Sequence, residues 1–595
     1  MRMKIVLPAT VLMLLFSTVM RIPFIPLVRA TTWTVDDDGP ADFHTIQEAI
    51  NNANDGDTIK VRSGTYYENV VMNKSLMLLG ENKTTTMIDG NKTGTVVRVA
   101  SDNVTVSGFT IQNSRHESGI YLNHSDDCVI NGNTLKGNHY GIKVYLSADC
   151  TVTENNVSDN DRGITVFASN YCTLSGNNVS DNLVGIESLA SDNCAISGNT
   201  VKENEGNGIK LDYSVNCTLK NNKMTRNKIN IAVEVTPGFS LEHFMHDIDV
   251  SNTVNGKPVY YLVNEHDKRI PENAGYVAAI NSTNITVENM NLTHNYDGVL
   301  FAFTSNSTVK NSKVSNVCTY YSVNCAIIGN NITYTGENWR GIYLVCSSNC
   351  TVIENNVVCN VLAYADIKLH NSSDNIFFHN NFINITHVEI YDSINVWDNS
   401  YPSGGNYWSD YVRNDACSGS YQNETDSDGI GDSRRFMAAN NVDSYPLMAP
   451  VKTFDVIFWD GHEYEIGILS NSTVANFQFN VSLIPEYPST ISFNLIGPEL
   501  TGAFCRIIIP NIIVQGFWND KCAVLLNGEP WPFRNWTDNT NTYIYFIHQH
   551  PTHEVIIIPE FPRALILLLF MITTLLAVTV YRIIDRLNFP SFSVV

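Results

Sequence analysis

Cysteine recurs through the middle of this chain at a nearly constant interval, and a Gly-Ile pair recurs with it. Successive members of both series are 22 or 23 residues apart. The series are Cys128, Cys150, Cys172, Cys194 and Cys217, and Gly119, Gly141, Gly163, Gly185 and Gly208. An internal repeat of this length constrains the architecture strongly, because each unit buries its apolar face against copies of itself.

Each repeat predicts short strands joined by polar turns. The residues after glycine alternate apolar and polar, as in Gly141-Ile-Lys-Val, and this pattern predicts a strand with one buried face. A second short strand begins at each cysteine. Asparagine, which tolerates left-handed turns and hydrogen-bonds to stacked copies of itself, recurs between them at Asn133, Asn155, Asn177, Asn199 and Asn222. The repeat therefore predicts coils of a parallel β-helix, each stacked about 4.8 Å above the last.

The rest of the chain divides around this body. We predict an all-β protein whose β-helix occupies residues 31–400, with a short N-terminal capping helix and an insertion at residues 236–280, where the repeat is lost. Residues 401–450 form a closing segment rich in Trp, Gly and Asp. Alternating runs broken by Pro and Gly predict an immunoglobulin-like β-sandwich at residues 451–558.

Both ends of the chain predict export. Residues 1–30 place two basic residues before an apolar run, which is typical of a signal peptide. Residues 559–581 end in an uncharged apolar stretch, which predicts one C-terminal transmembrane helix. Arg582 and Arg586 follow, so residues 582–595 are predicted to be a cytoplasmic tail and the bulk of the chain to lie on the extracellular face of the membrane, where its many Asn-x-Ser/Thr sites would permit glycosylation.

The net charge narrows the choice of partner. The formal charge is −22 at pH 7, which argues against nucleic acid and against anionic lipid. It is compatible with a neutral glycan, a cation or a basic partner. We therefore expect contact with the membrane only through the C-terminal anchor.

Several stretches identify a family resemblance. They are Ile46-Gln-Glu-Ala-Ile, Gly56-Asp-Thr-Ile-Lys-Val, Gly64-Thr-Tyr-Tyr-Glu, Lys74-Ser-Leu-Met-Leu-Leu-Gly, Gly404-Gly-Asn-Tyr-Trp-Ser-Asp-Tyr and Asp428-Gly-Ile-Gly-Asp. These resemble the opening and closing signatures of NosD-type, pectin-lyase-like proteins, and Pro559-Glu-Phe-Pro resembles the PEF-type C-terminal anchors of archaeal surface proteins. The resemblance implies a right-handed, single-stranded parallel β-helix. Because such proteins include glycan-binding proteins, sugar hydrolases and lyases, and an accessory protein of a copper enzyme, it implies fold more narrowly than function.

Aromatic and basic residues fill the predicted outward positions of the coils. Positions two and four after each glycine include Tyr121, Lys143, Tyr145 and Phe167. Because the apolar face of a sugar ring packs on an aromatic ring, these four residues are candidates for carbohydrate binding.

Acidic residues occupy the same outward positions further along. Glu187, Lys210, Asp212 and Glu234 are candidate catalytic residues, because neighbouring carboxylates can raise the pKa of one of them and a lyase can use a basic residue beside a substrate carboxylate. No Asp-pair, Gly-His-Gly or Arg-x-Lys signature of polygalacturonase-like enzymes is present. A solvated charged face is the alternative.

Two further clusters carry metal-ligand types. Glu424, Asp426, Asp428, Asp432 and the Ile430 carbonyl have the spacing of a short Asp-rich calcium loop, for which the alternative is a solvated acidic turn. We predict a structural calcium ion there. The NosD resemblance also suggests that the chain binds copper, for which imidazole and thioether groups are suitable ligands. The alternative is that these side chains are ordinary surface residues. The copper candidates are His243, Met245 and His246, with a second histidine cluster at His548, His550 and His553.

The chain has 13 cysteines. Val104 and Ile285 fill the cysteine position in other coils, which predicts that the main column faces the core as small apolar side chains. Cys505 and Cys522 lie outside the repeat and are candidates for a disulfide.

The sequence thus favours a surface-anchored β-helix protein that binds extracellular carbohydrate or cell-envelope material without catalysis. A polysaccharide lyase or glycoside hydrolase acting on the outward face is one alternative. A NosD-like copper-handling accessory protein is the other.

Overall fold

The computed structural model describes residues 30–560, apart from several short stretches. The stretches outside the description are residues 236–239, 335–340, 360–365, 386, 413, 458–460, 482–488, 499–501, 520 and 550–551. The predicted signal peptide (but for residue 30), the apolar stretch of the predicted membrane anchor and the predicted tail lie outside the described residues. Within them, every helix is too short or too polar to cross a bilayer.

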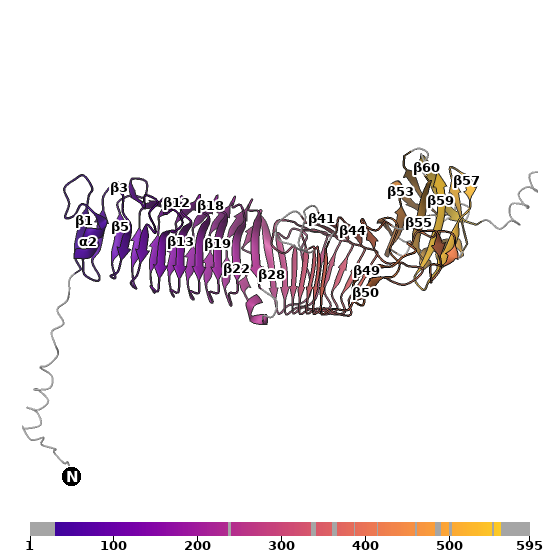
Figure 1. Cartoon of the computed structure of the whole chain (residues 1–595), viewed down its shortest axis with the longest axis horizontal. Coiled ribbons are helices and arrows are strands. Elements are labelled where there is room, and N and C mark those ends of the chain that lie inside the picture. Colours follow the sequence, from indigo (N-terminus) through magenta and orange to yellow (C-terminus); the bar gives the residue numbers. More distant parts are fainter. Residues whose placement is uncertain are drawn as a thin grey trace, which may run out of the picture. The chain divides into compact units, whose positions relative to one another are not determined.

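Residues 30–214 form coils of a parallel β-helix, with three short strands in each complete coil (Figure 1). The first sheet contains β1 (Thr32–Val35), β2 (Thr58–Val61), β5 (Met77–Gly80), β8 (Thr105–Ser107), β11 (Val129–Asn131), β14 (Thr151–Thr153), β17 (Thr173–Ser175) and β20 (Ala195–Ser197). The second contains β4 (Val70–Met72), β7 (Val97–Val99), β10 (Ser118–Asn123), β13 (Tyr140–Tyr145), β16 (Arg162–Phe167), β19 (Val184–Leu189) and β22 (Asn207–Asp212). The third contains β3 (Gly64–Tyr66), β6 (Thr86–Asp89), β9 (Thr110–Gln112), β12 (Thr134–Lys136), β15 (Asn156–Ser158), β18 (Asn178–Ser180) and β21 (Thr200–Lys202). The predicted parallel β-helix is confirmed.

The register stacks like on like. Ile142 of β13 pairs with Ile164 of β16, and both side chains are fully buried. The cysteine column follows the same rule, since Cys128, Cys150 and Cys172 are buried free thiols. The predicted apolar role of this column is therefore confirmed.

Buried asparagines provide hydrogen-bond partners for the backbone of the turns. The backbone N–H of Asn155 donates to Asn177 Oδ1 at 3.0 Å, and the Asn155 Nδ2 donates to the Ile130 and Thr153 carbonyls, both at 2.9 Å. Asn133 donates in the same way to Asn155 at 2.9 Å. Serines form a similar column in another turn of the coil, with members at Ser125, Ser147, Ser169, Ser191 and Ser214. Each coil thus completes the hydrogen bonding of the coil below it.

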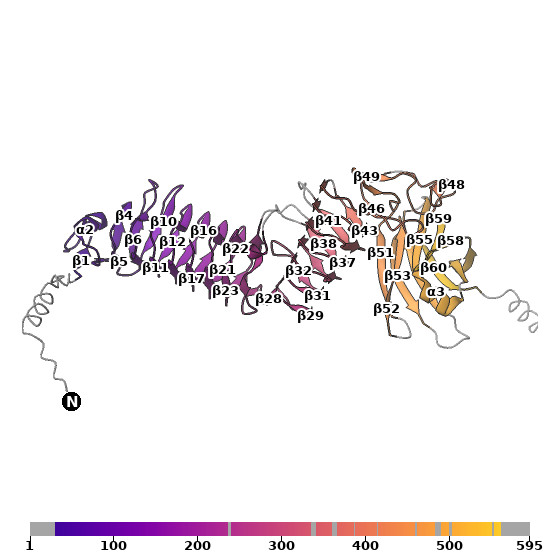
Figure 2. The same cartoon turned by 90° about the horizontal axis from the view of Figure 1, so that it is seen from below.

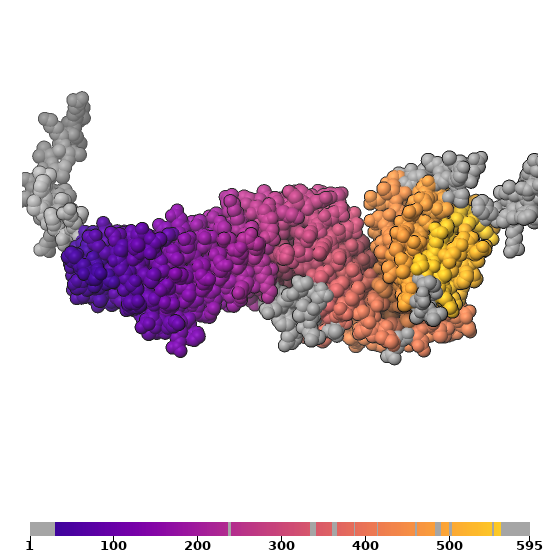
Figure 3. All heavy atoms as spheres, turned by 90° about the horizontal axis from the view of Figure 1, so that it is seen from above, coloured from indigo at the N-terminus to yellow at the C-terminus, as the bar shows by residue number. Residues whose placement is uncertain are grey.

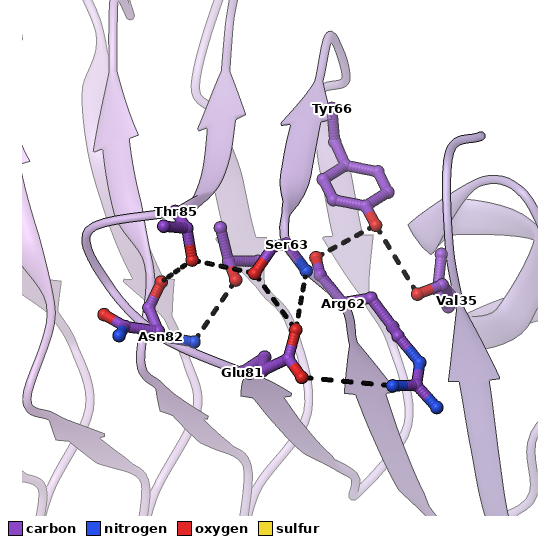
Figure 4. Close-up of polar contacts among 8 residues, drawn as sticks. Val35, Arg62, Ser63, Tyr66, Glu81, Asn82 and Thr85 are labelled. Carbon is purple, nitrogen blue, oxygen red and sulfur yellow. Dashed lines mark hydrogen bonds and ion pairs between the residues drawn. The ribbon is translucent and has the colours of Figure 1, made fainter. Parts of the chain in front are cut away.

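The N-terminal coils are closed by a helix and a polar network. The helix α2 (Ile46–Asn52) buries Ile46, Ala49 and Ile50, as the predicted capping helix requires. At the turn of the next coils, the Glu81 carboxylate accepts hydrogen bonds from the Ser63 backbone N–H and hydroxyl, both at 3.0 Å (Figure 4). These contacts are internal to the coil turns, and they stabilise the open end of the stack.

Residues 215–409 also form stacked coils. Their strands are β23 (Thr218–Lys220), β24 (Lys223–Thr225), β25 (Ile229–Glu234), β26 (Asp247–Ile248), β27 (Thr253–Val254), β28 (Lys257–Val263), β29 (His266–Arg269), β30 (Tyr276–Ile280), β31 (Thr283–Glu288), β32 (Asn291–Leu292), β33 (Val299–Ala302), β34 (Thr308–Lys310), β35 (Lys313–Val314), β36 (Val317–Tyr320), β37 (Ala326–Ile328), β38 (Asn331–Tyr334), β39 (Ile342–Val345), β40 (Thr351–Ile353), β41 (Asn356–Cys359), β42 (Ile367–His370), β43 (Ile376–Phe378), β44 (Asn381–Ile383), β45 (Val388–Tyr391) and β46 (Tyr407–Trp408). Parallel pairing runs through most of this region, as from β31 through β34, β37 and β40 to β43, of which β31, β37 and β43 are labelled in Figure 2.

The range predicted as an insertion contributes strands to these sheets. It contains the 3₁₀ helix η1 (Leu241–Phe244), after which β26 pairs with β23 and β27 pairs with β24. Asn252 accepts from the Asn222 backbone N–H, 30 residues away. This coil is longer than the 22-residue period, which is why the repeat could not be followed through it.

The closing segment seals the end of these coils. Its strands are β47 (Cys417–Ser418), β48 (Glu424–Thr425), β49 (Arg435–Ala438) and β50 (Asn441–Asp443). Trp397 and Trp408 are fully buried, and their indole N–H groups donate to Asn441 at 3.1 Å and to Asp443 at 2.9 Å. Burial raises the pKa of Asp443 to about 7. The signature Gly404-Gly-Asn-Tyr-Trp therefore provides the apolar lid over the last coil.

Residues 451–559 form two five-stranded antiparallel sheets that share one core. One sheet contains β51 (Val451–Ile457), β52 (Glu463–Ser470), β55 (Gly502–Pro510), β59 (Asn541–Gln549) and β58 (Arg534–Thr537). The other contains β53 (Thr473–Asn480), β54 (Thr490–Ile496), β60 (Thr552–Pro559), β56 (Cys522–Leu526) and β57 (Glu529–Trp531). The helix α3 (Asn511–Trp518) packs on the same core. An immunoglobulin-like arrangement of these strands stays a prediction.

The two cysteines of this region are free thiols. Cys505 and Cys522 both contact the shared core, so each packs as an apolar side chain and the disulfide predicted between them is absent. Burial raises the pKa of the Cys505 thiol, which keeps it protonated.

Candidate functional site

The outer face of the second sheet in residues 30–214 gathers aromatic side chains. Tyr121, Tyr145 and Phe167 lie on β10, β13 and β16, whose register places Asn123 beside Tyr145 and Tyr145 beside Phe167. The rings of Tyr145 and Phe167 are stacked, with centroids 5.4 Å apart and planes at 7°. The Tyr121 and Tyr145 centroids are 6.3 Å apart. All three rings are partly exposed, so they form a platform open to solvent. We call these three residues the aromatic platform.

Lys143 lies at the centre of three tyrosine rings. Its Nζ is 4.7 Å from the centroid of Tyr140, 5.3 Å from that of Tyr121 and 5.5 Å from that of Tyr145. Tyr140 was not among the candidates that the sequence suggests. It precedes the repeat glycine, at a position where the neighbouring coils have Ser118 and Arg162, so no recurring residue type marks it.

The acidic candidates of this sheet are held by cations. Glu187 forms ion pairs with Arg162 and with Lys210, whose Nζ is 3.9 Å from Glu187 Oε1. Lys210 also pairs with Asp212 at 2.8 Å. Glu187 and Asp212 are only 4 % and 9 % exposed. The structure therefore brings Glu187, Lys210 and Asp212 together as a charge-compensated network at the end of the face, and Arg162 is a member that the sequence did not reveal.

Glu234 lies on β25, in the second part of the chain. Its Oε1 accepts a hydrogen bond from the Tyr296 hydroxyl at 3.0 Å. The side chain is partly exposed, and this contact orients its carboxylate within residues 215–409.

The Asp-rich stretch is a turn whose carboxylates bind backbone N–H groups. Asp428 is fully buried and accepts from the Ile430 N–H at 3.0 Å, whereas Glu424 and Asp426 are exposed. Asp432 accepts from the backbone N–H groups of residues 416 and 417, both at 3.0 Å. Among the described residues, the acidic, histidine and cysteine side chains that bring three ligand atoms within 4.8 Å of one another are those of Asp36, Asp37 and Asp38, at the other end of the chain. A calcium ion at residues 424–432 stays a prediction.

Asp415 joins this turn from the preceding loop. Its carboxylate accepts from the Asp428 N–H at 3.0 Å and the Gly429 N–H at 2.8 Å. Burial, and after it the negative charges of Asp428 and Asp432, raise the pKa of Asp415 to about 7. A cation near these carboxylates would relieve their mutual repulsion, and this is the electrostatic argument for metal binding in the closing segment.

The closing segment is fastened to the two antiparallel sheets by arginines. Arg506 is fully buried, and its guanidinium donates to the Asp428 carbonyl at 2.5 Å and to the Pro402 carbonyl. Arg534 donates to the Ser427 carbonyl at 3.1 Å and to the Ser418 hydroxyl at 2.9 Å. Figure 3 shows the orange and yellow spheres of these parts in contact. These four hydrogen bonds fasten the closing segment to the two sheets.

A groove of about 1300 Å³ lies beside this fastening. Phe504, Trp531 and Tyr545 line it together with Asp415 and His548. Trp531 is 36 % exposed, and the Phe504 and Tyr545 rings are stacked with centroids 6.0 Å apart. The groove is therefore a second aromatic surface of the molecule.

A pair of glutamates faces a small cavity between β40 and β52. The cavity of about 280 Å³ is lined by Glu354, Glu465 and His379, among others. Burial, and after it a hydrogen bond and repulsion from Glu465, raise the pKa of Glu354 to about 9. Glu354 is therefore neutral at pH 7. No sequence spacing connects these two residues, so the pair was not expected.

The histidines near η1 do not assemble a copper centre. His246 is buried, and its Nδ1 accepts a hydrogen bond from the Cys217 N–H at 3.2 Å. Burial lowers the pKa of His246 to about 4, so the ring is neutral and carries its hydrogen on Nε2, which then has no lone pair for a metal. His243 and Met245 are both partly exposed. As placed, these residues do not fit copper, and copper handling stays a prediction about the chain.

The second histidine cluster is partly described. His548 and His553 have ring centroids 5.4 Å apart, and His553 Nδ1 pairs with the Asn527 amide at 2.8 Å. His550 lies outside the described residues. The described pair is thus already engaged in protein contacts.

Stacked parallel coils with an outward aromatic platform define a protein of the parallel β-helix class. The family model described as "Periplasmic copper-binding protein (NosD)" matches residues 50–242 and 236–412. These matches span more than half of the 595 residues, and the chain belongs to this family.

Other comparisons are more distant. A protein of Methanothermus fervidus named "Cell surface glycoprotein" is 33% identical over 96 residues, which are 16% of this chain and 16% of that protein, so the chain spans about a sixth of its length. Among solved structures, the Dettilon tailspike protein has a TM-score of 0.29 at 10% identity, covering 84% of this chain and 87% of that chain. An alginate lyase from Paenibacillus sp. has a TM-score of 0.26 at 12% identity, covering 55% and 93%. Likenesses this weak carry no argument about activity.

Proposed function

We propose that this protein is a cell-surface β-helix protein that binds extracellular carbohydrate on the outer face of β10, β13 and β16. The observation that carries the proposal is the aromatic platform, in which Tyr145 and Phe167 stack at 5.4 Å and Tyr121 extends the row. Partly exposed rings on a rigid sheet suit the flat apolar faces of sugar rings. The three strands keep the rings in place, so little ordering is needed when a ligand binds.

The geometry favours binding without catalysis. Glycoside cleavage needs one carboxyl group that can give up a proton and a second, ionised carboxylate beside it. On this face Glu187 is paired with Arg162 and Lys210, and Asp212 is paired with Lys210. These contacts balance the two acidic charges with two cations. The lyase or hydrolase alternative would require this network to open when substrate binds.

A surface location is part of the proposal. It is supported by the local similarity to a protein named "Cell surface glycoprotein" and by the signal-peptide pattern at the N-terminus. The uncharged apolar stretch before Arg582 would serve as the membrane anchor, with a PEF-type motif ahead of it. Fractionation of cells before and after carbonate washing would test the anchor, because an integral protein stays in the membrane pellet.

Binding to a panel of immobilised glycans tests the proposed function. The full-length protein in mild detergent should retain at least one class of polysaccharide. Tyr145→Ala and Phe167→Ala should each weaken that binding about tenfold, because each removes one stacking surface. The absence of binding to every member of a broad panel would overturn the proposal.

The matched control is an exposed aromatic residue outside the aromatic platform. Tyr171 lies on the same coils and is 58% exposed. Tyr171→Ala should leave both glycan binding and the thermal midpoint unchanged. Release of reducing or unsaturated sugars, measured on the same samples, would instead favour the enzymatic alternative, and Asp212→Asn should then abolish the release.

A further inference from the structure

Two cations on the aromatic face have no acidic partner. Lys143 contacts the three tyrosine rings described above, and it makes no ion pair or hydrogen bond with a described residue. Arg98, on β7, is exposed and likewise makes none. The chain carries a net charge of −22, so a face that presents cations without acidic neighbours differs locally in charge from the molecule as a whole.

The strand register places both cations in one column. Arg98 pairs with Tyr121, and Tyr121 pairs with Lys143 on the next strand. Neighbouring strands lie about 4.8 Å apart, so the two positions are about 10 Å apart along the stack with a tyrosine between them. The column thus alternates a cation, an aromatic ring and a cation. The stacked rings of Tyr145 and Phe167 lie on the same face.

The same column, two strands further along, shows how this fold neutralises outward cations. Arg162 and Lys210, on β16 and β22, share the carboxylate of Glu187. That carboxylate comes from the outward position of β19, two residues after the repeat glycine, and Lys143 occupies the same position of β13. A carboxylate on the coil next to Lys143 would therefore have been easy to place, but Thr165 and Tyr121 occupy the paired positions.

We propose that the glycan bound on this face is acidic, and that Lys143 and Arg98 hold its carboxylate or sulfate groups while its rings pack on the aromatic platform. This inference rests on the proposed function. Tyrosine rings attract a cation toward their faces and so hold Lys143 in place without neutralising it. An approaching anion supplies the missing countercharge, and a charge-assisted hydrogen bond from the ammonium group follows.

The phenol groups add donors around Lys143. The hydroxyl groups of Tyr140 and Tyr145 make no hydrogen bond to a described residue, whereas that of Tyr121 donates to Asn123 at 2.9 Å. Tyr140 and Tyr145 are both partly exposed, so their hydroxyl groups are available to a ligand. A neutral sugar would use the platform and these donors but would leave both cations without a countercharge.

Paired polysaccharides test the inference. The full-length protein is offered polygalacturonate beside its carboxyl-reduced form, and carrageenan beside its desulfated form. We expect the acidic member of at least one pair to bind about tenfold more tightly than its neutral form, and its binding to weaken as salt screens the charges. The two pairs distinguish a carboxylate ligand from a sulfate ligand.

Substitutions locate the anion. Lys143→Met keeps the length of the side chain and removes its charge, and it should weaken binding of the acidic polymer about tenfold, with a similar loss for Arg98→Met. Lys143→Arg should retain most of the binding. Lys136→Met, at an exposed position on β12 of another sheet, is the matched control and should change nothing.

The outcomes separate the two proposals. Equal binding of acidic and neutral forms, with Lys143→Met unchanged and Tyr145→Ala weakened, would overturn the acidic ligand and leave carbohydrate binding intact. Binding of an acidic polymer that is insensitive to both Lys143→Met and Arg98→Met would also overturn the inference. Binding to no polymer at all would overturn both. Unchanged thermal midpoints for the variants would show that lost binding does not reflect lost folding.

Discussion

The coils of residues 30–214 and those of residues 215–409 use the same ladders at different coil lengths. In the first part, successive ladder residues such as Asn133, Asn155 and Asn177 are 22 residues apart. In the second part the steps range from 17 residues, at Glu265 and Ser282, to 30 residues. A hydrogen-bonded side chain in the turn is therefore the constant of this fold, and the length of the intervening loop is free to change.

Both parts pair outward acidic side chains with cations, as Glu187 is paired in the first part. In the second part Glu288 lies between Arg269 and Lys310, and Lys310 Nζ is 2.9 Å from its carboxylate. Glu389 pairs there with Lys368 at 2.9 Å. The first part keeps two cations without acids beside an aromatic platform. Regular coils align their outward side chains in columns, and a polymer of repeating units can bind along such a column.

The largest effect is expected from the ladders themselves. Asn155→Ala removes a buried acceptor and three donations, so we expect a loss of about 2–4 kcal/mol in the free energy of unfolding. Asn355→Ala, in the irregular part, should cost a similar amount, because its side chain makes the same set of contacts. Urea unfolding followed by fluorescence measures both. Asn156→Ala, at an exposed outward position, is the control and should cost less than about 0.5 kcal/mol. A large difference between the two ladder variants would break the comparison.

A smaller effect is expected from the glutamate pair of the second part. The pKa of Glu354 is raised to about 9, so its protonated form stabilises the fold fully below the unfolded pKa near 4.5, and this contribution is lost as the pH rises through about 9. Glu354→Gln should therefore be more stable than the parent at pH 9, and this advantage should shrink as the pH falls toward 5. Thermal midpoints measured across this range would check the sign. A variant that is less stable at pH 9 would contradict it.

Calcium should act on the closing segment alone. If residues 424–432 bind the ion, millimolar calcium should stabilise the second part by about 1 kcal/mol, and Asp426→Asn should reduce this effect. Limited proteolysis with and without a chelator distinguishes the closing segment from the coils of residues 30–214. Equal protection of both parts, or of neither, would count against the predicted site.

The smallest effect is expected in the cysteine column. Cys172→Val and Cys350→Val exchange one buried apolar side chain for another of similar size, so each should change the free energy of unfolding by less than about 1 kcal/mol. Thiol reagents should label neither residue in the folded protein. Rapid labelling of Cys172 in the native state would show that the column opens more readily than its burial implies.

The sequence predicted the coils well because the repeat places the same residue type at the same point of each turn. It identified the aromatic platform for the same reason, since positions counted from the glycine alternate inward and outward. Tyr140 and Arg162 escaped because the position before the glycine carries no recurring residue type. The contacts of Glu187 with Arg162, 25 residues away, depend on side-chain reach rather than on spacing.

The far end of the chain was predicted less completely. The strands of residues 451–559 alternate clearly, but alternation does not show which strands pair, as β53 does with β54 and β54 with β60. The fastening of Asp428 to Arg506 spans 78 residues between two kinds of structure. No local pattern encodes such a contact, because it depends on how the closing segment and the sheets pack.

The asparagine ladder has a consequence for how such a protein can change its length over evolution. Because each rung accepts the N–H of the one before it, removal of a few residues would leave a buried amide without its acceptor, whereas removal of a whole period of 22 would rejoin one rung to another. The length of the β-helix can therefore change only by whole coils, each about 4.8 Å high. A lineage could lengthen its binding face by duplication of one coil at a time, and every intermediate would be a folded protein.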